Sequence, residues 1–408
     1  EGFGLENPET GKRATMHTVY RVGSVSKLFT DMGVMQMVEK GKINLDAPIT
    51  DYLPEFQPRN RFGRQVTLRQ LMSHRSGLLR EPLVGNYFDD TEPSLAVTVA
   101  SAANSDLIYE PESRIKYSNA GIAVVGYTLE RMSGKPFAAY LKEKVLEPMG
   151  LKASAFEPTG WVRKNLASAL MWSYDGREYA APTFELGMAP AGSMYAPITD
   201  LGKFMKVMFN GGGGPAGEVL KSETLEEMWT PQFGSGPNQG YGIGFGISEQ
   251  SGHKRVGHGG AIYGFATQLY MLPHEKLGVA AATSMDVSNS VTRRIAVYAL
   301  DLMLAANGGE PLPDFPHTAP VDSSLAGSLD GTYESESETV KIVERYGELT
   351  LHRRFIQSRL RARGDVLVSD DRLLYGTEII PGEDGTITVN GIAYEKVPRP
   401  KPETIPQR

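Results

Sequence analysis

A stretch rich in proline, glycine and serine separates two parts of this chain whose apolar residues follow different patterns. The stretch is GGEPLPDFPHTAPVDSS, residues 308–324, and it has the composition of a linker. Before it, apolar residues recur mostly at helical spacing. After it, they alternate with polar residues in short segments that end in glycine turns. We therefore expect a linker over residues 307–325 and a small antiparallel β domain, a barrel or half-barrel, over residues 326–408.

The part before the linker changes character twice. A short strand is expected at 16–22, followed by Gly23 and an amphipathic helix over 24–39. Residues 65–190 look mainly helical, and mixed helical and strand-like segments return after residue 190. The further expected helices are 67–74 (capped by Thr67, with Gly77 as a left-handed C-terminal cap), 95–104, 119–132, 136–147, 201–209 (capped by Thr199 or Asp200) and one ending near Ala306. The expected strands are 241–247, 265–272 and 277–284.

Composition excludes several classes of protein. The chain has no cysteine, which rules out cysteine nucleophiles, disulfides and thiolate metal sites but fits either redox compartment. Its net charge of −6 does not resemble the basic surface of a nucleic-acid-binding protein. No apolar run approaches the roughly 20 residues of a transmembrane helix. The sequence begins at Glu1 without an initiator Met, so we expect that part of the N-terminus is missing.

The pattern Ser-x-x-Lys occurs three times, with the serines at Ser24, Ser113 and Ser251. The last two lie in polar, loop-like stretches. Ser24 alone follows a strand and a glycine and opens a long amphipathic helix. The spacing by itself is weak evidence, but this context singles out Ser24 and its partner Lys27.

Ser24 and Lys27 have the chemistry of a nucleophile and its base. The unpaired amides of a helix N-terminus favour negative charge near Ser24. Residues three apart share one helix face, so the Lys27 amine is expected roughly 5–6 Å from Ser24. A serine hydroxyl needs a neighbouring base to take its proton, and a desolvated lysine can lose its charge and do so. The alternative is that Ser24 only caps the helix and Lys27 is a solvated cation.

Two further motifs each occur once. Tyr117-Ser118-Asn119 stands just before a predicted helix, and His258 begins His-Gly-Gly within the glycine-rich run VGHGGAIYG. Taken singly, Tyr117 fits a buried aromatic residue, Asn119 a helix cap and His258 a turn residue. The chain has no Gly-x-Ser-x-Gly elbow and no His-Glu-x-x-His. We therefore expect no metal and no cofactor.

Together and in this order, the three motifs resemble those of the serine β-lactamase and penicillin-binding protein family, in particular its class C and esterase-like branch. The resemblance runs from residue 1 to about 305 and includes the blocks GSVSKLFT, TLRQLMSHRSGL, IKYSNAGIAVVGYTLERMSG, PAGSMYAPITDLGKFM and HGGAIYGFATQLYMLP. It implies an α/β domain, residues 1–64 and 190–306, whose antiparallel sheet is flanked by helices. An inserted all-helical domain would span 65–189, with the catalytic cleft between the two. The segment from 326 is similar to the lipocalin-like tail of some esterase and peptidase relatives.

The resemblance also implies roles for individual residues. Ser24 would attack an acyl carbonyl while Lys27 assists removal of its proton. Tyr117 would act as general base or as a proton shuttle to the leaving group, and the sequence leaves open which of the two is the acylation base. Asn119 would orient Lys27 and the substrate amide. His258 stands where lactamases usually carry lysine.

The stretch after His258 carries the remaining expectations. The backbone amides of Ser24 and Ala261, next to Gly260, would form the oxyanion hole. Gly259 stands where β-lactamases and carboxypeptidases commonly place Thr or Ser to bind the substrate carboxylate, which argues against strong β-lactam or D-Ala-D-Ala specificity. The loop REPLVGNYFDD, residues 80–90, is expected either to line the substrate cleft or to be an ordinary surface loop.

The sequence therefore predicts a serine hydrolase that cleaves a small ester, amide or peptide through a Ser24 acyl-enzyme. A β-lactamase or D-Ala carboxypeptidase is the alternative of the same chemistry. A penicillin-binding sensor that acylates without turnover is the alternative of another class. No nucleic-acid partner is expected, and the sequence does not indicate the oligomeric state. The family resemblance fits a periplasmic or extracellular location, which the residues alone do not indicate.

Overall fold

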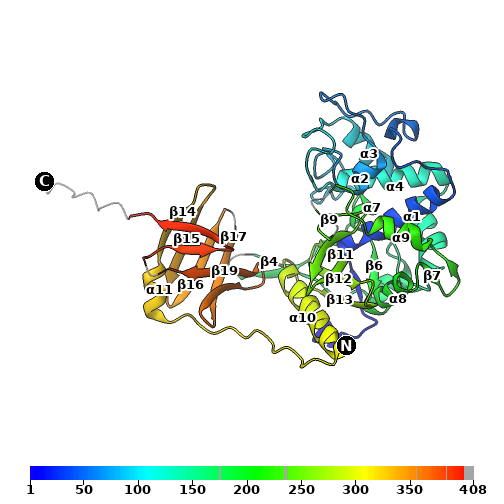
Figure 1. The fold of residues 1–408 in the computed structure, drawn as a ribbon. Coiled ribbons are helices and arrows are strands. Elements are labelled where there is room, and N and C mark those ends of the chain that lie inside the picture. The colour runs from blue at the N-terminus through cyan, green and yellow to red at the C-terminus, as the bar shows by residue number, and fades with distance from the viewer. Residues whose placement is uncertain (174–175, 234–235, 237, 355, 383, 399–408) are drawn as a thin grey trace. The chain divides into compact units, whose positions relative to one another are not determined.

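The computed structural model describes residues 1–398 apart from 174, 175, 234, 235, 237, 355 and 383. The chain divides into two compact units, residues 1–311 and 312–408. Figure 1 shows the elements of both units.

A five-stranded antiparallel sheet lies at the centre of the first unit, with the strand order β13-β12-β11-β10-β9. Its strands are β9 (Gly240–Tyr241), β10 (Gly246–Gln250), β11 (His253–Ile262), β12 (Phe265–Leu272) and β13 (Leu277–Thr283). The expected strands at 265–272 and 277–284 correspond to β12 and β13. The expected run 241–247 is instead divided between β9 and β10, because Gly244 makes a turn with φ +77°.

Helices pack around this sheet. The helix α10 (Asn289–Gly308) lies along β12 and β13, and α8 (Ile198–Phe209) packs against β13 (Figure 1). The other helices described in this unit are η1 (Gly23–Val25), α1 (Ser26–Glu39), η2 (Ile49–Asp51), α2 (Leu68–Met72), α3 (Leu95–Ala103), α4 (Asn119–Ser133), α5 (Phe137–Leu141), η3 (Lys142–Leu146), α6 (Gly160–Asn165), α7 (Ala189–Gly192) and α9 (Ser222–Met228).

Short two-stranded ladders complete the described part of the unit. They pair β1 (Leu5–Asn7) with β2 (Lys12–Arg13), β3 (Val19–Arg21) with β6 (Tyr195–Pro197), β4 (Leu170–Trp172) with β5 (Glu178–Ala180), and β7 (Gly213–Gly214) with β8 (Gly217–Glu218). The β3–β6 ladder matters most for the site, because β3 leads directly into η1 and α1.

Two predicted helix ends are wrong. The helix expected to start at Thr199 or Asp200 begins at Ile198, directly after Pro197, whose side chain cannot accept a capping hydrogen bond. Asp200 lies inside the helix and accepts hydrogen bonds from Ala153 N and Ser154 Oγ. These bonds hold the segment around residues 153–154 against α8. Gly77 does not cap α2, which ends at Met72. Gly77 instead has φ +78° in the following loop, where a Cβ atom would lie 1.9 Å from Tyr109 O.

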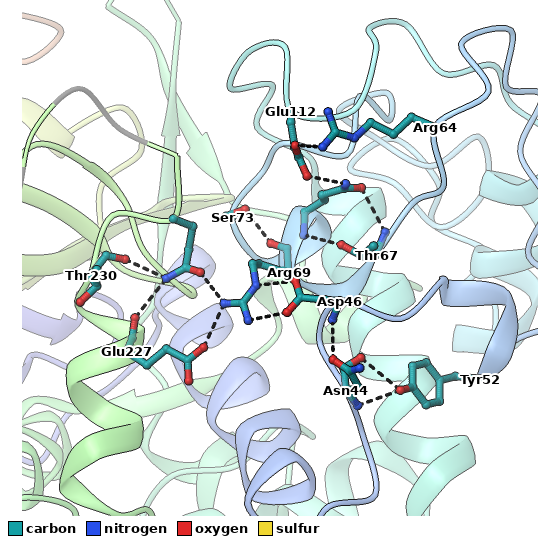
Figure 2. Close-up of polar contacts among 12 residues, drawn as sticks. Asn44, Asp46, Tyr52, Arg64, Thr67, Arg69, Ser73, Glu112, Glu227 and Thr230 are labelled. Carbon is teal, nitrogen blue, oxygen red and sulfur yellow. Dashed lines mark hydrogen bonds and ion pairs between the residues drawn. The ribbon is translucent and has the colours of Figure 1, made fainter.

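Side-chain contacts of Thr67 and Arg69 hold the start of the short helix α2 in place (Figure 2). Thr67 caps α2 as expected and forms a capping box with Gln70, in which each side chain accepts from the other residue's backbone N–H. The Arg69 guanidinium bonds both oxygens of Asp46 and one oxygen of Glu227. Glu227 belongs to α9, so this partly buried ion-pair network joins segments 158 residues apart.

The helix α1 runs through the main core. Leu28, Met32 and Met35 are fully buried in the same apolar cluster as residues from α4, α8 and the sheet. Burial of side chains of this size is worth about 1.5–3 kcal/mol each, so the position of α1 is strongly fixed. Any functional group at its N-terminus is held on a rigid element.

The second unit is a closed antiparallel barrel preceded by one short helix, α11 (Ser323–Leu329). Its strands are β14 (Gly331–Glu334), β15 (Thr339–Arg345), β16 (Glu348–Arg353), β17 (Ile356–Arg363), β18 (Val366–Asp370), β19 (Tyr375–Pro381), β20 (Ile387–Val389) and β21 (Ile392–Lys396). The expected antiparallel barrel is confirmed, and β14 closes it by pairing with both β15 and β21. Alternate residues such as Val340 and Ile342 point into its core.

The segment expected as a linker over 307–325 has local structure at both ends. The helix α10 continues to Gly308, and Gly309 caps it with φ +71°. Ala319 pairs with Ala362 of β17 through two backbone hydrogen bonds. The Asp322 side chain caps α11 by accepting from the amides of Ser324 and Leu325.

Candidate active site

Ser24 and Lys27 are in direct contact. Ser24 lies in η1, the single turn between β3 and α1, and Lys27 lies in the first turn of α1. The Lys27 Nζ is 2.9 Å from Ser24 Oγ and 2.6 Å from the carbonyl oxygen of Ala191. Lys27 is completely buried, and this burial lowers its pKa to about 7. A large fraction of the amine is therefore uncharged near neutral pH, beside a serine hydroxyl.

Tyr117 lies on the other side of this pair. Its hydroxyl hydrogen-bonds with the Ser24 side chain, and its ring centroid is 5.0 Å from Lys27 Nζ. The His74 ring packs against the Tyr117 ring with centroids 4.1 Å apart. Burial raises the pKa of Tyr117, so its phenol keeps its proton near neutral pH. The Ser118 side chain, and not Asn119, caps the following helix α4 by accepting from Gly121 N.

His258 lies on β11 and lines the same cavity as Ser24 and Tyr117. Its Nε2 is 2.7 Å from the Tyr241 hydroxyl, and its Nδ1 contacts the Gly259 carbonyl oxygen. Burial, and then the Lys27 charge, lower the His258 pKa to about 4, so the ring is neutral. A carbonyl oxygen only accepts, so Nδ1 carries the proton and Nε2 accepts from Tyr241.

Asn119 is buried at the start of α4, and its side-chain NH2 group donates hydrogen bonds to a carboxylate. The Nδ2 atom donates to both oxygens of Glu81, at 2.8 and 3.0 Å. The amide oxygen Oδ1, the atom of Asn119 that could accept from Lys27, has no hydrogen-bond partner among the described residues, so the expected role of Asn119 in orienting Lys27 stays a prediction. The backbone of Arg80 accepts from the amides of Asn119 and Ala120, so loop 80–90 is fixed to the helix N-terminus.

Two glycines let β11 approach the turn that carries Ser24. A Cβ atom added to Gly260 would lie 1.9 Å from Val22 O, and one added to Gly23 would lie 2.7 Å from Ala261 N. Gly23 also has φ +52°, which glycine adopts without steric cost. The backbone amides of Ser24 and Ala261 therefore belong to two segments in van der Waals contact.

A cavity of about 530 Å³ opens over these groups. Ser24, Tyr117, His258, Gly260 and Ala261 line it together. The loop 80–90 contributes Arg80, Tyr87 and Phe88 to the wall, so this loop lines the cleft. Its size suits a small molecule.

Comparison with known proteins decides the family. A family model described as Beta-lactamase matches residues 1–303. The chain belongs to the beta-lactamase family. It is 29% identical over 372 residues to "Beta-lactamase-like protein 2" of Dictyostelium discoideum, a match that covers 84% of this chain and 66% of that protein. It is 26% identical over 346 residues to "Penicillin-binding protein 4" of Amycolatopsis lactamdurans, covering 82% of this chain and 89% of that one.

A solved structure shares the fold. The octameric penicillin-binding protein homologue from Pyrococcus abyssi superimposes with a TM-score of 0.68 and 24% identity, covering 97% of this chain and 92% of that chain. The predicted fold class, a β-lactamase/transpeptidase-like α/β domain with a C-terminal antiparallel barrel, is confirmed. The protein is a serine hydrolase of the β-lactamase-like family.

The site departs from the usual family pattern at the residue after His258. A Cβ atom added to Gly259 would lie 3.2 Å from Gln268 Oε1. Gln268 is buried on the neighbouring strand β12, directly opposite Gly259 in the ladder. Its amide occupies the space next to the position where a family Thr or Ser would stand.

The described residues contain no group of three or more His, Asp or Glu side chains placed to hold a metal ion. No helix in the described part of the chain is both long and apolar enough to span a bilayer.

Sequence reasoning missed several side chains of the site. Glu81 holds Asn119, Tyr241 holds His258, and His74 packs on Tyr117. His74 lies inside the block TLRQLMSHRSGL, and Glu81 lies just after it in loop 80–90. Their closeness to these segments is the one feature of the sequence that could have pointed to a role in the site. Tyr241 begins the expected strand 241–247, but nothing in the sequence marks its hydroxyl as a partner of His258.

Proposed function

We propose that this protein hydrolyses a small ester or amide through an acyl-enzyme on Ser24. The observation that carries the proposal is the contact between Ser24 Oγ and the buried Lys27 Nζ, whose pKa is lowered to about 7. A serine with an uncharged amine at hydrogen-bond distance has the base that nucleophilic attack requires.

Lys27 serves as the acylation base and Tyr117 as the proton shuttle. Burial lowers the pKa of Lys27 but raises that of Tyr117, so the amine and not the phenol is ready to accept a proton near pH 7. The Ser24 Oγ–H bond breaks as an Nζ–H bond forms, and Oγ bonds the substrate carbonyl carbon. The proton then passes through the Tyr117 hydroxyl to the leaving group as its bond to carbon breaks.

The main chain stabilises the charge that develops on the carbonyl oxygen. The amides of Ser24 and Ala261 lie on segments that the Gly23 and Gly260 contacts hold together. Donors fixed in this way cost no reorganisation at the moment of reaction. In the second half of the reaction, water replaces the leaving group and the same groups release the acid.

The substrate is a short ester, or a small amide or peptide with D-residues, in preference to a β-lactam. Gly259 offers no hydroxyl for the carboxylate that penicillins and cephalosporins carry, and Gln268 fills the adjacent space. A penicillin-recognising sensor that acylates without turnover is the second candidate. It draws support from the similarity to a protein named Penicillin-binding protein 4.

Covalent labelling of the purified chain tests the nucleophile. The protein is treated with an aryl phosphonate or with penicillin and weighed intact, and turnover of a short-chain aryl ester is measured in parallel. We expect one phosphonate adduct per chain and rapid ester turnover. Ser24→Ala should abolish the adduct and reduce turnover about a thousandfold or more while the protein stays folded.

The chain supplies two matched controls. Ser113→Ala and Ser251→Ala remove the serines of the other Ser-x-x-Lys patterns and should leave labelling and turnover unchanged. A persistent penicillin adduct without ester turnover would favour the sensor. Undiminished turnover in Ser24→Ala would refute an acyl-enzyme on Ser24.

A further inference from the structure

One helical turn beyond Lys27 lies a carboxyl group for which the described residues offer no hydrogen bond. Asp31 is completely buried on α1, and neither of its side-chain oxygens has a hydrogen-bond partner among the described residues. Asp200, an equally buried carboxylate, accepts from Ala153 N, Ser154 Oγ and Lys203 Nζ. An isolated buried carboxylate is costly, so Asp31 requires an explanation that core packing does not give.

Asp31 lies on the side of α1 that continues the line from Ser24 in η1 through Lys27. Ser24, Lys27 and Asp31 follow one another at spacings of three and four residues, so they share one helix face. The Asp31 carboxyl packs against the β9–β10 turn. A Cβ atom added to Gly244 in that turn would lie 2.6 Å from Asp31 Oδ2. Glycine at this position therefore leaves the space that the carboxyl occupies.

Two buried ionisable groups on one stripe influence each other's proton. Burial disfavours the charged form of each, lowering the pKa of Lys27 and raising that of Asp31. An Asp31 carboxylate stabilises the Lys27 ammonium, and the ammonium stabilises the carboxylate. Groups this close share macroscopic protonation steps and do not titrate independently.

We propose that Asp31 is a positioning residue that acts as the buried counter-ion of Lys27 and sets the pH at which Lys27 becomes available as a base. The proposal rests on the proposed function, because it assumes that uncharged Lys27 accepts the Ser24 proton. No bond other than N–H and O–H changes: the pair exchanges a proton internally or with water as pH changes.

The other ionisable and aromatic groups around the pair come from the loop after α2, the start of α4 and strands β9 and β11. They are His74, Arg80, Glu81, Tyr117, Tyr241 and His258. Burial keeps both histidines and both tyrosines uncharged near neutral pH. Glu81 raises the Lys27 pKa more than Asp31 does, and Arg80 lowers it by less than either. Asp31 is thus the acidic group on α1 itself that supports the Lys27 charge.

The test is the pH dependence of acylation in Asp31→Asn. This substitution keeps the shape of the side chain but removes the negative charge, so the Lys27 pKa should fall. The uncharged amine would then persist to lower pH. We expect the acid limb of ester kcat/KM, and of phosphonate labelling, to move about one pH unit lower. The plateau rate should stay within about tenfold of the native value.

Two variants keep the result interpretable. Asp31→Glu retains a carboxyl and should keep the acid limb near its native position. Asp200→Asn removes an equally buried but fully hydrogen-bonded carboxylate, so it should lower the melting temperature without moving the limb. The role of Asp31 would be overturned if the acid limbs of the native protein and of Asp31→Asn coincide. A normal Ser24 adduct in both proteins would then leave the proposed function intact. Absence of any Ser24 adduct in the native protein would instead overturn the proposed function.

Discussion

The Tyr241 hydroxyl lies 2.7 Å from Nε2 of His258 and joins β9 to β11 across the intervening strand β10. Both residues are half-buried within the site, and the Tyr241 ring also contacts His74, with centroids 4.8 Å apart. The hydrogen bond fixes the orientation and the tautomer of the histidine. His258 therefore offers the cavity a fixed, uncharged ring at the position where lactamases usually carry a lysine ammonium.

Tyr241→Phe should lower ester kcat/KM about tenfold, because it removes the hydrogen-bond partner of the half-buried Nε2 acceptor and frees the ring to rotate. Steady-state kinetics and a thermal melt measure the two effects. Tyr140→Phe is the matched control, since it removes a buried tyrosine hydrogen bond to Gln36 away from the cleft. It should affect stability alone. Equal kinetic effects of the two variants would contradict a specific role for Tyr241.

The rate should follow the protonation of Lys27. Its pKa is lowered to about 7, so the amine is uncharged above that pH and gains a proton as the pH falls through it. We expect ester kcat/KM to be constant above pH 7 and to fall roughly tenfold per pH unit below it. Lys27→Arg, which stays charged at every pH, should be inactive throughout the range. A Lys27→Arg enzyme with native activity at pH 8 would contradict this assignment.

Gly259→Ser should shift substrate preference toward β-lactams. The new Cβ atom meets the far end of the Gln268 side chain at 3.2 Å, and a small rotation of that amide makes room. The added hydroxyl can then bond a substrate carboxylate. The ratio of kcat/KM for a chromogenic cephalosporin to that for an aryl ester should rise severalfold, while Gly259→Ala, which adds the carbon without the hydroxyl, should not raise it. An unchanged ratio in Gly259→Ser would show that this position does not govern the preference.

Residues 1–311 expressed alone should fold and hydrolyse a small aryl ester nearly as fast as the full chain. The apolar core of this unit and that of the barrel are separate clusters, so residues 1–311 contain a complete core of their own. Comparing a small with a bulky ester in the two proteins tests whether the barrel restricts entry to the cleft. A changed ratio of the two rates would assign it a gating role. Failure of the fragment to fold would contradict the independence of the two units.

The sequence alone was enough to predict the elements whose apolar residues recur at regular helical or strand spacing. The helix spacing after Ser24 and the alternation after residue 326 correspond to α1 and the barrel strands. The spacing of Ser24 and Lys27 predicted that the two side chains lie on one side of the turn, but the Nζ–Oγ distance of 2.9 Å is shorter than the roughly 5–6 Å expected from helix spacing.

Features set by tertiary contacts were not predictable in the same way. The strand β11 contains Gly257, Gly259 and Gly260, which weaken any strand signal, and its neighbours in the sheet hold it in place. Glu81 and Asp31 belong to no motif. Their significance comes from burial and from partners, or the lack of partners, that only the folded chain reveals.

The close contact between Gly260 and Val22 has a consequence for how substitutions in this protein are interpreted. Any side chain at position 260 would push β11 away from the nucleophile turn and separate the amides of Ser24 and Ala261. Gly260 would then score as indispensable in a mutational scan although it contributes no reactive group. The proposed oxyanion hole thus depends on how closely two stretches of main chain approach, so substitutions of cleft side chains that leave Gly23 and Gly260 in place should preserve it.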